Sequence, residues 1–361
     1  MSLVFRIITR RDVWRRILSL IKQLTMNRTI MVVGIDISMD DFHACIKVRK
    51  GFGVATIKGT RAFQNTLDGF KKFLQWVFDR KKDDYALNFV MEATGIYCED
   101  LAYFLHSSKE RVSVVLANKI KSYARSLNIK TKTDKVDSKI IAGFGIEREL
   151  DEWKPMSPVY KELRDFCREY LSIKKEMNRA KNQLHAMTRS HNKTNRIQKL
   201  KKRQIGFYQK TLQSIEMELN RIVEEDPLLK EKITKLESIP GIGFETAVIL
   251  ASETNGFELI TSIRQLVSYV GLDVEFKESG KFKGKTRITK KGNSRIRQAL
   301  FMPAMSATRF NEHIKTLHER ICERNPEVKK KGVVAGMRKL LIYAFVIWKK
   351  DVVYDRKYVW S

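Results

Sequence analysis

Residues 29–38 read TIMVVGIDIS, an apolar and largely β-branched run of strand length that carries one carboxylate, Asp36. Such a run predicts a buried strand. A carboxylate in the middle of a buried strand costs free energy unless something pairs with it. The fold built around this strand therefore has to supply a partner for Asp36.

The residues that follow predict an antiparallel meander and a helix. Alternating patterns at 42–50 and 53–60 indicate two more strands, and turn signals before and between them connect the three strands directly. An amphipathic helix is predicted from residue 65. Its apolar face carries Leu67, Phe70, Leu74, Val77 and Phe78.

Strands and helices then alternate up to residue 150. Strands are predicted at 86–93 and 111–117, and helices at 98–108, 118–127 and 135–150. The resulting order, βββαβαβα, is that of the ribonuclease H fold, an α/β sheet whose first three strands are antiparallel. The sequence therefore predicts an α/β domain of this fold, followed by an all-α region.

Two prolines, Pro155 and Pro158, mark the end of the α/β domain. The basic region that follows carries apolar residues at spacings of three to seven, which predicts two long helices joined near residues 191–196. Such helices form an antiparallel hairpin or an intermolecular coiled coil, and they indicate an arm for self-association. We divide the chain into a basic extension, a catalytic domain, a coiled-coil arm and a mainly helical C-terminal domain, at residues 1–28, 29–152, 158–232 and 233–350.

The charge balance favours a polyanionic partner. The chain has 70 Lys and Arg against 41 Asp and Glu, a net charge of +29. No apolar run reaches the ~18 residues of a spanning helix, and the arginines within residues 1–25 interrupt any secretory signal. Nucleic acid is therefore favoured over a membrane.

The cysteines indicate a reduced, cytoplasmic protein. They are widely scattered and form no CxxC pair, so neither a disulfide framework nor a structural zinc site is expected. They are Cys45, Cys98, Cys167 and Cys322.

Three more carboxylates join Asp36 in the predicted sheet domain. Glu92 ends the fourth strand, which neighbours the first in a ribonuclease H sheet, and Asp134 and Asp137 of KTDKVDS (132–138) share one face of the last helix. Four converging carboxylates require cations, and two Mg²⁺ ions suit such an oxygen site for phosphoryl transfer. In the alternative reading, Asp134 caps this helix and Asp137 interacts with its dipole.

The stretch 236–253, LESIPGIGFETAVILASE, has the pattern of a helix-hairpin-helix. Its turn allows the backbone to approach a DNA phosphate at a helix N-terminus without reading sequence. The residues of that turn are Pro240, Gly241, Ile242 and Gly243. The alternative is a plain helix–turn–helix corner in the core.

The stretch 271–300 is rich in lysine and arginine and predicts a phosphate-binding strip. The strip comprises Lys277, Lys281, Lys283, Lys285, Arg287, Lys290, Lys291, Arg295 and Arg297. Within it, Ser279 precedes Gly280, a pair that by itself indicates only a turn.

Six stretches together resemble the transposases of the insertion-sequence 110 family, the DEDD transposases also described as bridge-RNA-guided recombinases. They are GIDIS, MEATGIY, KTDKVDSKIIA, IPGIG, YVGLDVEFKESG and ITKKGNSRIRQAL, and the similarity extends from about residue 32 to residue 341. Two positions depart from the family pattern. Met39 stands where members often carry Lys, and Asp273-Val274 where they often carry Pro.

The resemblance implies a RuvC-like domain whose acidic residues fall on Asp36, Glu92, Asp134 and Asp137, and a serine nucleophile that falls on Ser279. It also implies an active site completed between subunits of a dimer or tetramer, with donor and target DNA brought together by a bridge RNA. The serine would hold the cut strand covalently.

Two other readings of the residues remain open. A RuvC-like, metal-dependent endonuclease would use water as its nucleophile and would need the acidic cluster but not Ser279. A non-catalytic nucleic-acid-binding protein with a decayed nuclease fold would need neither, and the four intact carboxylates argue against it.

Overall fold

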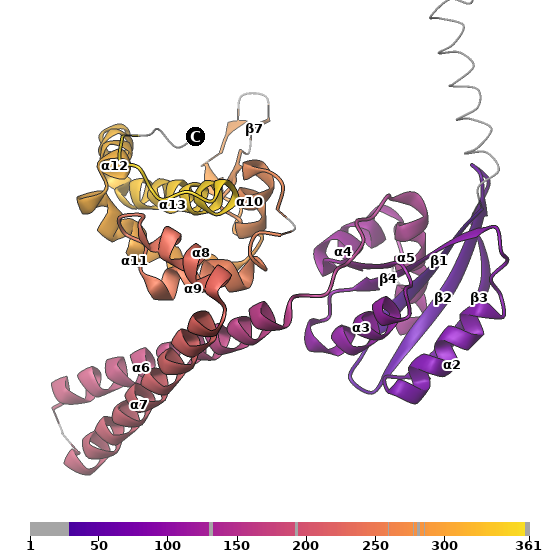
Figure 1. Cartoon of the computed structure of the whole chain (residues 1–361), viewed down its shortest axis with the longest axis horizontal. Helices are drawn as coiled ribbons and strands as arrows, with labels where there is room; N and C mark the ends of the chain where they lie inside the picture. The colour runs from indigo at the N-terminus through magenta and orange to yellow at the C-terminus, as the bar shows by residue number, and fades with distance from the viewer. Residues whose placement is uncertain are drawn as a thin grey trace, which may run out of the picture. The chain divides into compact units, whose positions relative to one another are not determined.

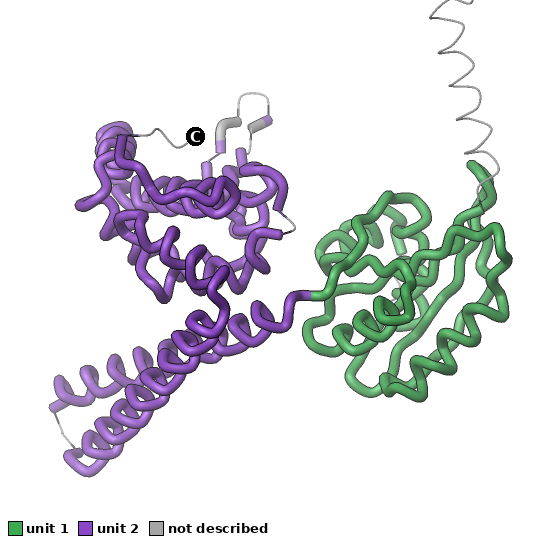
Figure 2. The backbone as a smooth tube through the Cα atoms, in the orientation of Figure 1, with its two compact units in different colours: residues 1–155 green, residues 156–361 purple. Residues whose placement is uncertain are grey.

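The computed structural model describes residues 29–129, 133–191, 194–258, 260–276, 278–279, 282–284 and 286–357. The chain divides into two compact units, residues 1–155 and 156–361 (Figure 2). The basic extension predicted at residues 1–28 lies outside the described ranges, as do Lys277, Lys281 and Lys285. Within those ranges no helix combines the length and apolar character needed to cross a membrane.

The first unit is built on a five-stranded sheet with the order β3-β2-β1-β4-β5 (Figure 1). The strands are β1 (Thr29–Ile37), β2 (Asp41–Lys50), β3 (Thr56–Gln64), β4 (Tyr85–Glu92) and β5 (Val112–Val115). The first three pair antiparallel, β4 runs parallel to β1, and β5 runs parallel to β4. The antiparallel pairing of the first three strands and the pairing of β1 with β4 agree with the prediction, and the mixed α/β sheet is confirmed.

Helices cover both faces of this sheet. They are α2 (Leu67–Phe78), α3 (Glu99–Ser107), which follows a short turn η1 (Gly95–Cys98), α4 (Ala117–Ser126) and α5 (Asp134–Glu147). Met31, Val33 and Ile35 of β1 share a core with α2 and α3, whereas Val32 shares one with α4 and α5. Because side chains alternate along a strand, Asp36 points to the same side as Val32, toward α4 and α5.

The apolar face predicted for α2 is partly wrong. Phe70 and Val77 are buried as predicted, but Leu67 and Phe78 are 59% and 38% exposed. The helix also buries Phe73 and Trp76, which the prediction left out. The difference follows from β3, which continues to Gln64, beyond its predicted end at residue 60. The longer strand places a phenylalanine, Phe63, opposite Phe42, and the rings of Phe73 and Trp76 pack on it with centroids 5.3 and 5.4 Å away.

The second unit consists of a two-helix hairpin and a helical bundle (Figure 1). The hairpin comprises α6 (Pro158–Arg189) and α7 (Asn195–Glu225). The bundle comprises α8 (Pro227–Glu237), α9 (Phe244–Glu253), α10 (Ile263–Val270), α11 (Ser294–Phe310), α12 (Glu312–Arg324), η2 (Pro326–Val328) and α13 (Lys330–Lys350). Four two-residue strands lie between α10 and α11: β6 (Val274–Glu275), β7 (Glu278–Ser279), β8 (Phe282–Lys283) and β9 (Arg287–Ile288).

One hydrophobic core joins the base of the hairpin to the bundle. On α7, apolar residues at 212, 215, 219 and 222 are buried, as are Leu163, Cys167 and Tyr170 on α6. Of the two arrangements predicted for these helices, α6 and α7 thus form an antiparallel hairpin within the chain. Self-association through a coiled coil stays a prediction.

A glycine sets how closely α5 lies against the sheet. A Cβ built on Gly34 of β1 would lie 2.1 Å from the backbone nitrogen of Ala142 and 2.4 Å from the carbonyl oxygen of Ser138, both on α5. Backbone atoms cannot turn aside, so the close approach requires glycine. Because Gly34 is two residues from Asp36 and Ser138 adjoins Asp137, the same contact positions two carboxylates.

We therefore expect Gly34→Ala to destabilise the first unit by about 3 kcal/mol or more, since the added methyl forces α5 off β1. Amide hydrogen exchange of β1 and α5, read by mass spectrometry, measures the effect. Gly206→Ala on α7 is the contrasting change, because nothing lies within 4 Å of its Cβ. It should stabilise the second unit by about 0.5–1 kcal/mol. Unchanged protection of α5 in Gly34→Ala would contradict the packing argument.

Candidate functional site

Two carboxylates meet at one edge of the sheet in the first unit. The parallel register pairs Ile35 of β1 with Met91 of β4, so that Asp36 and Glu92 follow on neighbouring strands. Both occupy the carboxyl ends of their strands and share the strand face of Val32 and Val90, toward α4 and α5. The helix α5 then adds Asp134 and Asp137 from its first turn.

These four carboxylates line a single cavity of about 700 Å³. Its walls come from the ends of β1 and β4, the start of β2, and the helices α4 and α5. The other polar residues around it include Ser38, Asp41, His43, Thr94, Asn118, Lys121 and Arg125. The structure thus brings together the four acidic residues that the sequence singled out.

The cavity disfavours negative charge on Asp36. Burial, together with three neighbouring carboxylates, raises the pKa of Asp36 to about 6, and burial has the largest effect. In decreasing order of effect, they are Asp137, Asp134 and Glu92. A cation placed among these groups would remove the repulsion, so the electrostatics of the cavity favour a positively charged ligand.

The alternative role of Asp134 as a helix cap does not apply. Thr133 is the N-cap of α5, and its hydroxyl accepts a hydrogen bond of 3.3 Å from the backbone N–H of Val136. Asp134 is the first residue of the helix, and its side chain is 68% exposed. Its carboxylate is therefore available to the cavity.

The donor set is all-oxygen, as hard divalent ions require. Within the described ranges, however, no group of three or more His, Cys, Asp or Glu side chains is arranged to hold a metal ion. The four carboxylates line the cavity without converging on one position where a single ion could contact all of them. A bound ion would draw them inward, and the exposure of Asp134 leaves it free to move.

His43 is a cavity residue that the sequence reasoning missed. It pairs with Asp36 across the β1–β2 hairpin, and its Nδ1 lies 4.0 Å from Oδ2 of Asp134. That buried nitrogen has no hydrogen-bond partner among the described residues. Counting back from the turn at 39–41 pairs residue 37 with 42 and residue 36 with 43, so the signal was present in the hairpin register.

Ser279 lies in the second unit, on a small exposed hairpin. It belongs to β7 and pairs with Phe282 of β8. Its side chain is exposed. Ser279 thus belongs to the second unit, whereas the acidic cavity belongs to the first.

The base of this hairpin is held by specific contacts. Thr289 donates from its hydroxyl to the carboxylate of Asp273 at 2.5 Å and from its N–H to the carbonyl of Asp273 at 2.9 Å. Gly292, at φ +146°, passes so close to Tyr269 that a Cβ would lie 2.3 Å from its carbonyl oxygen. Asp273 stands where members of the family often carry Pro. Its contacts with Thr289 join the two ends of the segment between β6 and β9, which carries Ser279.

A buried carboxylate anchors the segment after the hairpin. The side chain of Glu253 is 2% exposed and accepts hydrogen bonds from Arg168 of α6 at 2.8 and 3.2 Å and from Asn293 at 2.7 Å. Burial alone would raise the pKa of Glu253, but these bonds and the nearby arginines hold it below its ordinary value. Asn293 caps α11, so this network links the arm to the helix that follows the hairpin.

The IPGIG turn lies between α8 and α9, as predicted. Gly241, at φ +110°, packs against α11, where a Cβ would lie 2.8 Å from that of Ala307, and Ile242 is buried. Pro240 is half-buried, whereas Gly243, the N-cap of α9, is open. A phosphate contact at this turn stays a prediction.

The predicted basic strip divides into two groups. Arg287, Lys290, Lys291 and Arg295 are exposed. Arg297 instead donates to the backbone carbonyls of Val270 and Gly292 at 2.5 and 3.2 Å, so it supports the loop. Of Lys283 the structure describes only the backbone, and Lys277, Lys281 and Lys285 lie outside the described residues.

The sheet topology and the carboxylate-lined edge define an α/β protein of the ribonuclease H class. A DEDD-type transposase model of the IS110 group matches residues 33–192, and the model described as "Transposase IS116/IS110/IS902 family" matches residues 233–319. The chain belongs to this IS110 family of transposases, which are enzymes that cleave and rejoin DNA.

Curated relatives match nearly the whole chain. The pilin gene-inverting proteins of Moraxella bovis and Moraxella lacunata are each 26% identical over 334 residues, covering 90% of this chain and 98% of theirs. Among solved structures, Thermus thermophilus RuvC is 11% identical and covers 34% of this chain and 99% of its own, with a TM-score of 0.27. The assignment to the ribonuclease H class rests on the strand order and directions of the sheet, and not on this likeness to RuvC.

Proposed function

We propose that this transposase cuts and rejoins DNA with a divalent-metal site at Asp36, Glu92, Asp134 and Asp137 and with Ser279 as nucleophile. The observation that carries the proposal is the convergence of four carboxylates, from β1, β4 and α5, on one cavity around a desolvated Asp36. Mg²⁺ held there would polarise the scissile phosphate and stabilise the leaving oxygen. The four carboxylates would hold the cation.

Ser279 supplies the covalent step. Its Oγ forms a bond to the phosphorus, the bond between that phosphorus and a deoxyribose oxygen breaks, and the serine proton ends on the released oxygen. Reversal with a different strand's oxygen rejoins the DNA without hydrolysis. The exposed position of Ser279 on a short hairpin supports this role, as do the exposed cations Arg287 and Lys290 in the same segment between α10 and α11.

Assembly and guidance extend the proposal. The acidic cavity of one subunit would act with the serine of another in a dimer or tetramer, and a bridge RNA would pair with donor and target DNA. The family membership and the net charge of +29 support nucleic-acid partners of both kinds.

The proposal is tested by assaying for a covalent protein–DNA adduct. Purified protein is incubated with DNA that carries the junction of the mobile element and with RNA from its flank, with Mg²⁺ or with a chelator, and then denatured. We expect a protein–DNA adduct only with Mg²⁺, and peptide mapping should place the DNA on Ser279. Cut DNA without any adduct would instead establish the second candidate, a hydrolytic RuvC-like endonuclease with the same acidic site.

A further inference from the structure

The helix α4 forms the wall of the acidic cavity that carries positive charge. It follows β5, whose carboxyl end lies at the same sheet edge as those of the parallel strands β1 and β4. Its first turn therefore starts beside Asp36 and Glu92. Ile120 and Tyr123 bury the helix against the sheet, which fixes which of its faces meets the cavity.

The cavity face of α4 carries Asn118, Lys121 and Arg125, at helical spacings of three and four. Both cations are exposed, and in the described part of the chain neither takes part in an ion pair or a side-chain hydrogen bond. Among the described residues no carboxylate forms an ion pair with either cation. Their charges are available to a ligand.

The cavity is thus polarised. Its carboxylates lie on β1, β4 and α5, and its free cations lie on α4. Lys121 and Arg125 are four residues apart, which is about 6 Å along a helix axis. A DNA strand rises about 3.4 Å per nucleotide, so the two cations span roughly two nucleotides of its backbone.

We infer that Lys121 and Arg125 bind the backbone phosphates of the DNA strand that enters the carboxylate cavity. This phosphate clamp, Lys121 with Arg125, rests on the proposed function, because it positions the strand at the acidic site. The lysine acts as a point charge, and the arginine can grip a phosphate through two N–H groups. Contacts of this kind position the backbone without reading bases.

The clamp is tested by DNA binding in an Asp36→Asn background, where the strand stays intact. The affinity for a DNA of fixed sequence is measured at several salt concentrations for the full chain, with and without Lys121→Ala and Arg125→Ala. Loss of two phosphate contacts should reduce the slope of log affinity against log salt by about 1.4 to 1.8. Lys121→Arg with Arg125→Lys keeps both charges and should retain most of the slope.

A matched control removes the same charge elsewhere. The control combines Lys119→Ala with Lys72→Ala. Lys119 lies on the other flank of α4, beside a separate hollow lined by Ser122 and Ser126, and Lys72 lies on α2. This double variant should change the slope by less than about half a unit. An equal change in both double variants would overturn the clamp and leave only a general charge effect.

The clamp and the proposed function can fail separately. The clamp is refuted if the alanine pair melts at the wild-type temperature and keeps the wild-type salt slope. If the slope falls as expected but wild-type protein with Mg²⁺ never cuts or captures DNA, the clamp stands and the catalytic proposal fails. If the alanine pair fails to fold, Lys121→Gln with Arg125→Gln decides, because it removes the same two charges and keeps long polar side chains. A slope reduced by about 1.4 to 1.8 supports the clamp, and a wild-type slope refutes it.

Discussion

Ser279→Ala is expected to abolish the covalent protein–DNA adduct. The substitution removes the Oγ that forms the bond to phosphorus and leaves the acidic cavity, in the other unit, unchanged. Adduct formation by wild type and variant is compared after denaturation, with Mg²⁺ and the same DNA and RNA. Rejoined products should vanish with the adduct, because strand exchange proceeds through it.

The control for this variant is a second exposed serine of the same unit. Ser268 lies on α10, and its backbone carbonyl accepts a hydrogen bond from the N–H of Gly271. Ser268→Ala should therefore form the adduct at the wild-type level. If Ser279→Ala cuts DNA at an undiminished rate, water is the nucleophile and the role assigned to Ser279 is wrong.

Asp36→Asn is expected to reduce the rate of DNA cleavage by at least about 10³-fold. The carboxylate of Asp36 is desolvated by burial, and the loss of metal-ion stabilisation worth several kcal/mol corresponds to this factor. Cleavage and adduct formation should fall together, since both need the same site. Single-turnover assays with excess protein measure the two rates.

The same variant should be more stable than the wild type without metal. Burial and like charges raise the pKa of Asp36 to about 6, so its carboxylate destabilises the folded state, fully above pH 6 and progressively less as the pH falls toward its ordinary value. Asparagine removes that penalty, which is at most about 3 kcal/mol. Mg²⁺ should raise the melting temperature of the wild type and leave that of the variant unchanged.

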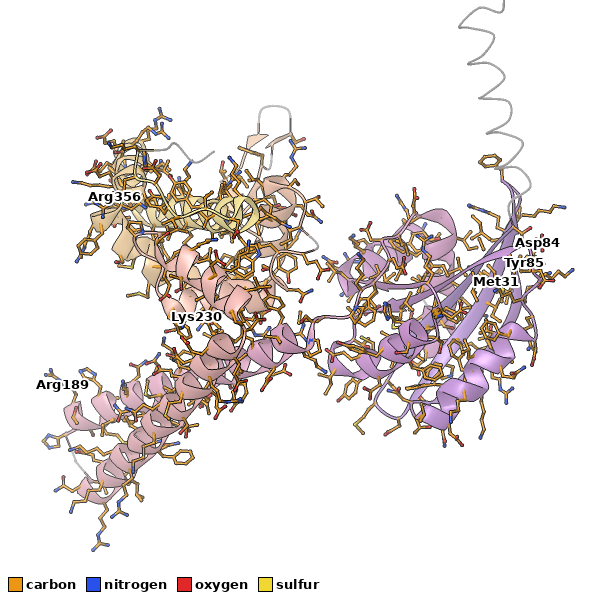
Figure 3. All side chains as sticks on the ribbon, viewed as in Figure 1. Met31, Asp84, Tyr85, Arg189, Lys230 and Arg356 are labelled. Carbon is orange, nitrogen blue, oxygen red and sulfur yellow. The ribbon has the colours of Figure 1, made fainter. Side chains whose placement is uncertain are left out.

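A distant aspartate provides the control. Asp84 precedes β4 and adjoins Tyr85 (Figure 3). Tyr85 pairs with Thr29, which is at the opposite end of β1 from Asp36. Asp84→Asn should keep both the cleavage rate and the Mg²⁺ response. A Mg²⁺ response that persists in Asp36→Asn would show that the ion binds elsewhere.

Much of the α/β domain followed from local patterns. Period-two alternation and turn residues depend only on neighbouring positions, so the strands and their order along the chain were predictable. That order matched the ribonuclease H fold, in which the first and fourth strands are neighbours, and so the meeting of Asp36 with Glu92 was predictable as well. The error in α2 has a different origin. Its buried face depends on Phe63, which the longer β3 brings opposite Phe42, and helix periodicity alone does not contain that partner.

In the second unit the sequence did not reveal which basic residues make contacts within the fold. Lysine and arginine look alike in a charge run whether they meet solvent or a carbonyl group. Arg297 binds the carbonyls of Val270 and Gly292, and Asp273, which reads only as a departure from the family, closes the base of the serine hairpin.

The sequence by itself determined the α/β fold, the four carboxylates and the polyanionic partner, because these follow from spacing, residue type and charge. Only the tertiary structure decided the rest of the site. It placed His43 beside Asp134, gave the cap of α5 to Thr133, and set Lys121 and Arg125 across the cavity from the acids. Such placements depend on how closely helices pack against the sheet, and that distance is set by contacts such as Gly34 with α5, between residues about a hundred positions apart.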